Sequence, residues 1–378
     1  MAKLGEVCKV SPSTKNIERQ GAWLLNLDMV EQQTGRVIEY KYVGEDDLNG
    51  SIIQFDTENV LYSKLRPNLN KVVLPQKDGF STSELLPLRP DARVLNRDYL
   101  AVFLRSDSFV TWAVSKTAGA KMPRLGTKDL MSAEIPVPTI EQQKKIAEKF
   151  KKLEQLISLR KQQLAKLNEL VKARFVEMFG DPVTNPKGYE KYKLENLARK
   201  ISDGVHSKPD YTETGRPFLS VVNINKGVIN FKNCKYVSED AYQKMIKSTH
   251  PERGDVLYTK VGATYGIPAY VDTDIAFCLY VSVCLIKPKR EVINPRFLSL
   301  SMEMPYVKHQ ADRRIKGIGV PDLHLNQISE FEILCPPLKE QDIFIYFVER
   351  LDGEKRVVQQ SLEKLELMKK ALMQEYFG

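Results

Sequence analysis

The chain has 378 residues, 42% of them hydrophobic and 28% charged, which is ordinary for a soluble globular protein of two or three domains. Its formal net charge of +9 is compatible with a polyanionic partner but does not identify one. The five cysteines form no Cys-x-x-Cys pair, which argues against a disulfide framework or a zinc ribbon. The longest apolar run, residues 275–286, is too short to span a bilayer, so we expect a cytoplasmic protein with no membrane segment.

Residues 1–138 are predicted to form a mixed α/β domain. Short apolar or alternating runs separated by Gly, Pro, Asn and Asp indicate strands. These runs are residues 37–43, 50–55, 60–63, 71–74 and 85–88. One helix is expected over residues 97–113, with its aromatic and leucine side chains on one buried face. Pro136 and Pro138 end the domain, because proline lacks an amide donor and disfavours helix in the residue before it.

Residues 139–180 are predicted to form one long helix, a first helical spacer. Apolar residues recur there with the alternating four- and three-residue spacing of a coiled-coil seam. The seam positions are Ile146, Phe150, Leu153, Ile157, Leu164, Leu167, Val171 and Met178, with one break at Arg160. A helix of this length greatly exceeds the average of about 11 to 12 residues, so it needs a partner along its whole seam.

Residues 181–336 are predicted to form a turn-rich linker and a second mixed domain. Its strand candidates are residues 218–222, 228–231, 256–260, 269–271 and 275–286, the last as one buried strand, and its main helix is residues 295–307. Residues 337–378 are predicted to form a second long helix. Its seam comprises Phe344, Val348, Leu351, Val358, Leu362, Leu365, Leu372 and Tyr376, interrupted by Lys355 and Lys369.

The two halves of the chain repeat each other at an offset of 198 residues, as from Gln143 to Gln341. The sequence therefore predicts an α+β protein. Two mixed domains would be joined by two long helices packed as an antiparallel coiled coil, and the internal repeat would give a pseudo-two-fold arrangement. Residues 1–58 and 193–254 differ most between the halves, so we expect them to bind different things.

The chain lacks the motifs of the common DNA-modifying enzymes. A DNA amino-methyltransferase needs an Asn/Asp/Ser-Pro-Pro-aromatic tetrapeptide, but Pro336-Pro337 has neither the polar head nor the aromatic tail. There is no P-loop, and no Pro-Asp pair precedes a suitable acid-x-Lys of a nuclease. The four histidines have no short metal-ligand spacing. The sequence thus predicts neither catalysis nor a bound metal or cofactor.

DNA contact is the remaining chemistry that the sequence suggests. Basic and amide side chains in loops marked by Pro or Gly are the types that hold phosphates and base edges. The candidates are Lys64, Arg66, Asn68, Lys71, Lys121, Arg124, His206, Lys208, Lys260, Arg313, Arg314 and Lys316. Each of these taken singly is also typical of a solvated surface.

Several short motifs together carry a family resemblance. They are Ile135-Pro136-Val137-Pro138 with Glu141-Gln142-Gln143, Cys335-Pro336-Pro337-Leu338-Lys339-Glu340-Gln341, Met178-Phe179-Gly180-Asp181-Pro182, Ile201-Ser202-Asp203-Gly204-Val205-His206 with Phe218-Leu219-Ser220-Val221, and Gly254-Asp255-Val256-Leu257. With these motifs the chain resembles, over nearly its full length, the specificity subunit of type I restriction-modification systems. The first half departs from the pattern: it has Glu58-Asn59 in place of Gly254-Asp255 and no Asp-Gly-x-His turn.

The resemblance implies a non-catalytic reader of double-stranded DNA. Two target-recognition domains would each bind one half of a split asymmetric site, and the helices would serve as a spacer that docks two modification subunits. Those partners would carry S-adenosylmethionine, while separate restriction/translocase subunits would use ATP and Mg²⁺. Two alternatives remain: a coiled-coil scaffold without DNA affinity, and a stand-alone methyltransferase-nuclease. Salt-sensitive DNA binding would distinguish a reader from a scaffold.

Overall fold

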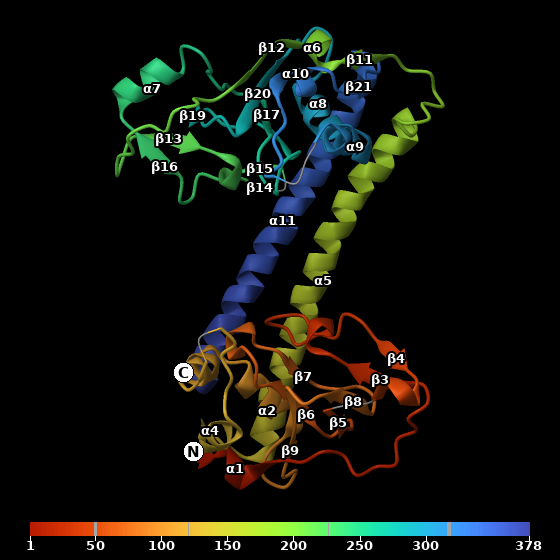
Figure 1. The fold of residues 1–378 in the computed structure, drawn as a ribbon, viewed down its shortest axis with the longest axis vertical. Coiled ribbons are helices and arrows are strands. Elements are labelled where there is room, and N and C mark those ends of the chain that lie inside the picture. Colours follow the sequence, from red (N-terminus) through yellow and green to blue (C-terminus); the bar gives the residue numbers. More distant parts are fainter. Residues whose placement is uncertain (49–50, 120, 226, 316–318) are drawn as a thin grey trace. The chain divides into compact units, whose positions relative to one another are not determined.

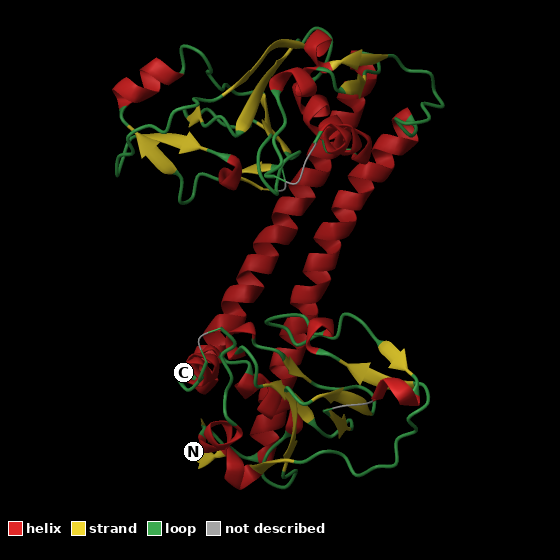
Figure 2. Cartoon of the chain, in the orientation of Figure 1, coloured by secondary structure: helices red, strands yellow, loops and turns green. Residues whose placement is uncertain are grey.

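The computed structural model describes residues 1–48, 51–119, 121–225, 227–315 and 319–378. The chain divides into two compact units, one of residues 1–163 with 358–378 and the other of residues 164–357. Each unit contains part of both long helices, α5 (Ile140–Phe179) and α11 (Leu338–Phe377). Figures 1 and 2 show these helices and the sheets around them.

The first unit is sheet-rich, with short helices on its core. Its elements before α5 are β1 (Ala2–Lys3), α1 (Leu4–Val7), β2 (Cys8–Val10), β3 (Ala22–Leu25), η1 (Leu27–Met29), β4 (Lys41–Val43), η2 (Glu45–Leu48), β5 (Ile52–Phe55), β6 (Val60–Ser63), η3 (Pro67–Leu69), β7 (Val72–Val73), β8 (Gly79–Thr82), β9 (Leu85–Pro90), α2 (Arg97–Leu104), α3 (Asp107–Ser115), α4 (Thr127–Ser132) and β10 (Glu134–Ile135).

Two four-stranded sheets organise this unit. The first has the order β2-β9-β6-β7 with antiparallel pairs throughout. The second has the order β4-β3-β8-β5, in which β3 and β8 run parallel. The first sheet packs with α2, α3 and the ends of both long helices into one core. In that core the Phe377 ring lies 5.4 Å from Tyr99 and 5.9 Å from Phe103, centroid to centroid.

The single helix expected over residues 97–113 is wrong, because the structure has two helices there. α2 ends at Leu104 and α3 begins at Asp107. Ser106 lies between them in extended conformation, and its hydroxyl accepts a hydrogen bond from the Phe109 amide at 3.3 Å. A serine in this N-cap position satisfies a free amide of the new helix, which favours the break.

The second unit contains the same kinds of element. Between α5 and α11 they are β11 (Lys191–Lys193), α6 (Leu194–Leu197), β12 (Ala198–Asp203), β13 (Arg216–Leu219), η4 (Val221–Asn223), β14 (Ile224–Asn225), β15 (Val228–Ile229), β16 (Lys235–Val237), α7 (Glu239–Met245), β17 (Val256–Thr259), β18 (Pro268–Tyr270), β19 (Cys278–Leu279), β20 (Val283–Pro288), α8 (Pro295–Met302), α9 (Pro305–Arg314), α10 (Leu325–Ser329) and β21 (Glu332–Leu334). Its two larger sheets have the orders β12-β20-β17-β18 and β16-β13-β19.

The single buried strand expected over residues 275–286 is also wrong. The run forms β19, which pairs parallel with β13, and β20, which pairs antiparallel with β17. A turn separates them, closed by a hydrogen bond from the Val283 amide to the Tyr280 carbonyl at 3.0 Å. The run is apolar apart from Ser282 because both strands are buried, and hydrophobicity alone could not show the turn.

The prediction of two long helices is confirmed, with 40 residues in each. In the first unit they run in opposite directions, since Lys149 contacts Tyr376, Glu154 contacts Lys369, and Arg160 contacts Ser361. Arg160, the predicted break in the seam, donates to the Ser361 hydroxyl at 3.2 Å. The polar interruption is therefore satisfied across the pair.

The second unit packs the other ends of the two helices around an aromatic cluster. The Phe175 ring lies 5.6 Å from Phe344 and 5.8 Å from Phe297 of α8. Phe179 lies 5.6 Å from Phe344, and all four rings are almost fully buried. The cluster joins the second unit's core to both helices, because Phe297 belongs to a helix that packs against the sheet strand β17.

Several element bounds recur 198 residues apart. β9 corresponds in this way to β20, α2 to α8, and α5 to α11, each with the same length. β6 and β17 correspond at 196 residues. No helix within the described part of the chain is long and apolar enough to cross a membrane.

Candidate nucleic-acid interface

The first group of candidate residues lies in the loop that follows β6. Backbone hydrogen bonds join this loop to residues 123–125. The Arg66 amide donates to the Pro123 carbonyl at 2.8 Å, and the Leu125 amide donates to the Lys64 carbonyl at 2.9 Å. The two candidate segments of the first half, which are separate in the sequence, thus form one surface.

Arg66 is displayed by a constrained backbone. Its φ of 49° is left-handed, which is uncommon for a residue with a side chain. It caps η3, whose first residue is the buried Pro67, and Asn70 at the other end is again left-handed. Asn70 donates to the Arg105 carbonyl at 3.1 Å, which ties the loop to the core. The Arg66 and Asn68 side chains are therefore exposed on a rigid support.

The other cations of this surface differ in how far they are already paired. Arg124 is half exposed and donates to the Glu84 carboxylate at 3.2 and 3.4 Å. Lys71 donates to the Leu27 carbonyl at 2.5 Å, and burial lowers its pKa although Asp28 opposes that shift. In the described part of the chain, the side chains of Lys64, Arg66 and Lys121 have no ion pair. These three are the cations most available to a phosphate.

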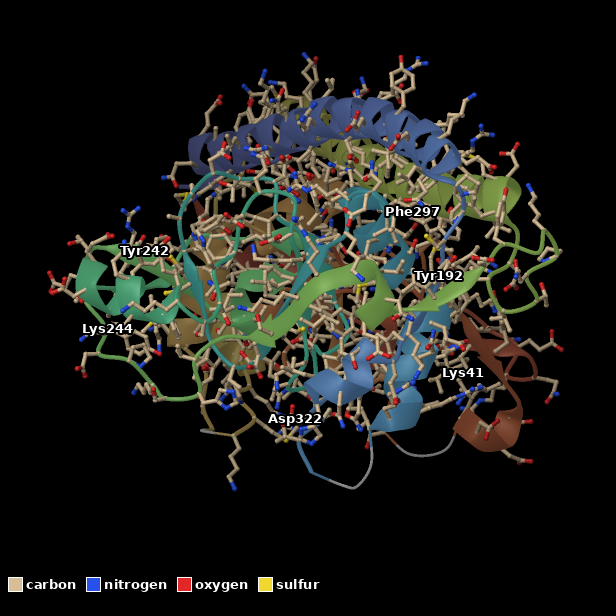
Figure 3. All side chains as sticks on the ribbon, turned by 90° about the horizontal axis from the view of Figure 1, so that it is seen from above. Lys41, Tyr192, Tyr242, Lys244, Phe297 and Asp322 are labelled. Atoms are coloured by element: carbon tan, nitrogen blue, oxygen red, sulfur yellow. The ribbon has the colours of Figure 1, made fainter. Side chains whose placement is uncertain are left out.

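In the second unit, the equivalent position holds a buried ionic cluster. Lys260 follows β17 as Lys64 follows β6, and its carbonyl accepts from the Leu323 amide at 2.9 Å. Its side chain is only 7% exposed and its amine lies 3.5 Å from Asp203 and 3.7 Å from Asp322. Figure 3 labels Asp322 beside the loops of this unit. Two carboxylates therefore already neutralise Lys260, and its DNA contact stays a prediction.

Asp203 also links this cluster to His206. Its second carboxylate oxygen lies 3.3 Å from His206 Nε2, and the imidazole is 76% exposed. The intervening Gly204 lies so close to β19 that a Cβ atom would fall 2.0 Å from the Leu279 carbonyl oxygen. Only glycine fits there, which explains the Asp-Gly-x-His turn. The turn presents an exposed His206 above a fixed Asp203–Lys260 pair.

The remaining candidates lie elsewhere in the second unit. Lys208 is exposed, with its amine 5.7 Å from the centre of the Tyr211 ring. Arg313 is exposed on α9 and lines a groove of about 520 Å³. Arg314 packs over Phe331 at 5.3 Å and donates to the Gln310 carbonyl at 3.0 Å. Lys316 lies outside the described residues.

Sequence reasoning missed the groups that organise these surfaces. Glu84, Asp203 and Asp322 were not among the candidates, although each pairs with one of them. Glu84 and Asp322 are distant in sequence from the cations they pair with, so no spacing signal existed for them, whereas Asp203 lies only three residues before His206 and the Asp-Gly-x-His spacing could have identified it. No cluster of three or more His, Cys, Asp or Glu able to hold a metal occurs among the residues described.

Residues 1–169 and 186–367 match the family described as type I restriction modification DNA specificity domain. The chain belongs to this family. It is 24% identical over 327 residues to the type I restriction enzyme MjaVIII specificity subunit of Methanocaldococcus jannaschii, an alignment covering 81% of this chain and 75% of that protein. With the EcoBI specificity subunit of Escherichia coli the identity is 22%, covering 70% of this chain and 61% of the relative.

A solved structure shares the fold. The S subunit of the type I restriction-modification system from M. genitalium superposes with a TM-score of 0.59 at 14% identity, covering all of this chain and 95% of that one. Family membership makes the chain a DNA specificity subunit, which recognises sequence and is not itself the enzyme. The scaffold and stand-alone enzyme alternatives are not favoured.

Proposed function

We propose that this specificity subunit reads a bipartite DNA target, one half with each unit. The main support for this proposal is that β6 and β17 are each followed by a lysine whose carbonyl accepts a backbone hydrogen bond from a second loop. Around these lysines the exposed groups differ: Arg66 and Asn68 lie in the loop after β6, whereas His206 comes from the turn after β12 and is joined to Lys260 through Asp203. Different side chains on a repeated support suit the reading of two different half-sites.

The recognition domains in this proposal are residues 1–138 and 181–336, and residues 139–180 and 337–378 are helical spacers. The spacers pack as an antiparallel coiled coil in a pseudo-two-fold repeat. The opposed contacts of α5 and α11 in the first unit, their aromatic contact in the second and the recurring element bounds support both points.

The partners in this proposal are two modification subunits and restriction/translocase subunits in the cytoplasm. They bind S-adenosylmethionine, ATP and Mg²⁺, while this chain recognises the DNA target sequence. The similarity to named specificity subunits supports the assignment, since those proteins are components of type I restriction enzymes. All twelve candidate residues remain proposed DNA contacts. Among them Lys260 is buried, and Asp203 joins its amine to the exposed His206.

Replacing residues 193–330 with the same region of a relative tests whether each unit recognises one half of the target. Mapping methylated adenines in cells that carry the hybrid should show a change in one half of the target and none in the other. A change in both halves would refute the assignment of one half-site to each unit.

Arg66→Ala tests the contact surface in the first unit. If Arg66 reads a guanine, binding should weaken by about 1 to 3 kcal/mol with relaxed base preference, and if it holds a phosphate, binding should weaken uniformly with a smaller salt slope. Arg93→Ala is the matched control, because Arg93 is exposed and paired with Asp91 away from this loop. Equal binding by the two variants would remove Arg66 from the contacts.

A further inference from the structure

Residues 1–58 and 193–254, which differ most between the halves, each contain an edge strand with the same three-residue sequence. β4 is Lys41-Tyr42-Val43 and β16 is Lys235-Tyr236-Val237, each at the end of its sheet. Lys41 lies opposite Leu24 of β3, and Lys235 lies opposite Phe218 of β13. β3 and β13 in turn pair parallel with β8 and β19. The tripeptide therefore occupies the same register of the same small sheet in both units.

Packing explains two of the three shared residues. Val43 and Val237 are buried in the small clusters beside their sheets. Tyr42 and Tyr236 lie opposite Trp23 and Pro217 on the other face, where large flat side chains suit a pleated surface. Neither role requires a charge.

The shared lysines have no such role. Lys41 and Lys235 are both exposed, and across the described ranges neither amine lies within 4 Å of a carboxylate oxygen. The Lys235 amine lies 4.2 Å from the centre of the Tyr211 ring, a cation–π contact that attracts the charge without neutralising it. Figure 3 labels Lys41 on its strand. Lysine therefore occupies the equivalent position in both units although the surrounding sequences differ, and packing of the core does not require it there.

We infer that Lys41 and Lys235 are equivalent contacts to the DNA sugar-phosphate backbone, one in each unit. The two units read different bases, but both meet the same phosphate chain, so a shared exposed cation fits the common part of the ligand. The divergent loops around each lysine would then carry the sequence preference. This inference rests on the proposed DNA-reading function and adds contacts outside the twelve candidates.

A competing explanation is that the lysines only guard exposed strand edges, since charged side chains discourage edge-to-edge pairing. Substitution by glutamate separates the two roles, because it keeps a charge on the edge while reversing its sign. The test compares wild type, Lys41→Glu/Lys235→Glu and Lys41→Arg/Lys235→Arg. The matched control is Lys128→Glu/Lys166→Glu, at exposed lysines on α4 and α5 with no described ion pair.

The measurement is affinity for duplex DNA containing the target, taken by fluorescence anisotropy on the full chain over about 50 to 200 mM salt. Each lost phosphate contact should reduce the log–log salt slope by about 0.9, so the double glutamate variant should lose about 1.8. At about 0.1 M salt the same relation predicts roughly a tenfold loss of affinity per lysine. The arginine variant should bind like wild type, and methylation mapping should find the same target for all variants.

Three results would overturn the inference. A double glutamate variant with the slope and affinity of the control would assign the lysines to edge protection. A changed base at one target position would make them base readers rather than backbone contacts. Wild-type chain without salt-dependent DNA binding would refute the proposed function itself, and this inference with it.

Discussion

Replacement of Gln143 by methionine should loosen the start of α5, because this buried glutamine holds three backbone groups. Its amide nitrogen donates to the carbonyls of Val94 and Pro138 at 2.9 and 2.8 Å, and its oxygen accepts from the Asn96 amide at 2.7 Å. The side chain is fully buried. Methionine has a similar length but can replace none of these hydrogen bonds.

The expected effect follows from those three bonds. At a net value of about 1 kcal/mol for each hydrogen bond, the loss of all three should destabilise this junction by about 3 kcal/mol. The loss should be larger if water cannot reach the backbone groups that are left without a partner. A loss of about 3 kcal/mol corresponds to roughly a hundredfold increase in local opening. Gln341 makes the matching bonds in the second unit, where the Asn294 amide donates to it at 2.8 Å.

Hydrogen exchange with mass spectrometry on the peptide around residues 94–100 is the assay. Gln143→Met should speed exchange there and leave the peptide around Asn294 unchanged, while Gln341→Met should do the reverse. Gln162→Met provides the control, since Gln162 is exposed on α5 and makes no described side-chain contact. Equal protection in Gln143→Met and Gln162→Met would show that the buried glutamine does not hold this junction.

Two further predictions concern titration. Burial alone would raise the pKa of Asp56, but hydrogen bonds from Arg89 and Ser13 outweigh it and hold the pKa below its usual value. Its stabilisation is therefore present above about pH 4 and is lost as pH falls through the lowered pKa. Urea denaturation should find Asp56→Asn less stable than wild type at pH 7, with a gap that narrows near pH 3; a constant gap would contradict the ion pair. Burial also raises the pKa of the Cys8 and Cys278 thiols to about 12, so at pH 8 neither should react with a thiol reagent until denaturant is added. Rapid labelling of either cysteine in the native chain would show that it is not enclosed.

The long helices could be predicted from sequence because their seams extend over many turns, and α5 and α11 begin and end within a residue or two of the expected limits. β3 and β8 were missed. Both are four-residue strands, buried almost throughout, and too short for an alternating pattern. They pair with each other although Leu24 and Phe80 are far apart in sequence, which is information that only the tertiary fold contains.

The candidate site shows the same limit. The basic loops around Arg66 and Arg124 were predicted separately, but the hydrogen bond that joins them runs between the Arg66 amide and the Pro123 carbonyl, which have no sequence signature. Lys260 was predicted as a DNA contact. Its burial depends on Asp203 and Asp322, whose proximity arises from strand pairing and loop packing.

The sharing of each long helix between units has a consequence during synthesis. The first unit needs Phe377 beside Tyr99 and Phe103, and the Ser108 hydroxyl donates to the Phe377 carbonyl across 269 residues of sequence. At about 5 to 20 residues per second, a ribosome takes tens of seconds to make the intervening chain. During that interval the apolar residues of the first unit that pack against Phe377 remain exposed. A nascent chain stalled before residue 358 should therefore bind chaperones through its first unit, even though nearly all of that unit's sheet residues have already emerged.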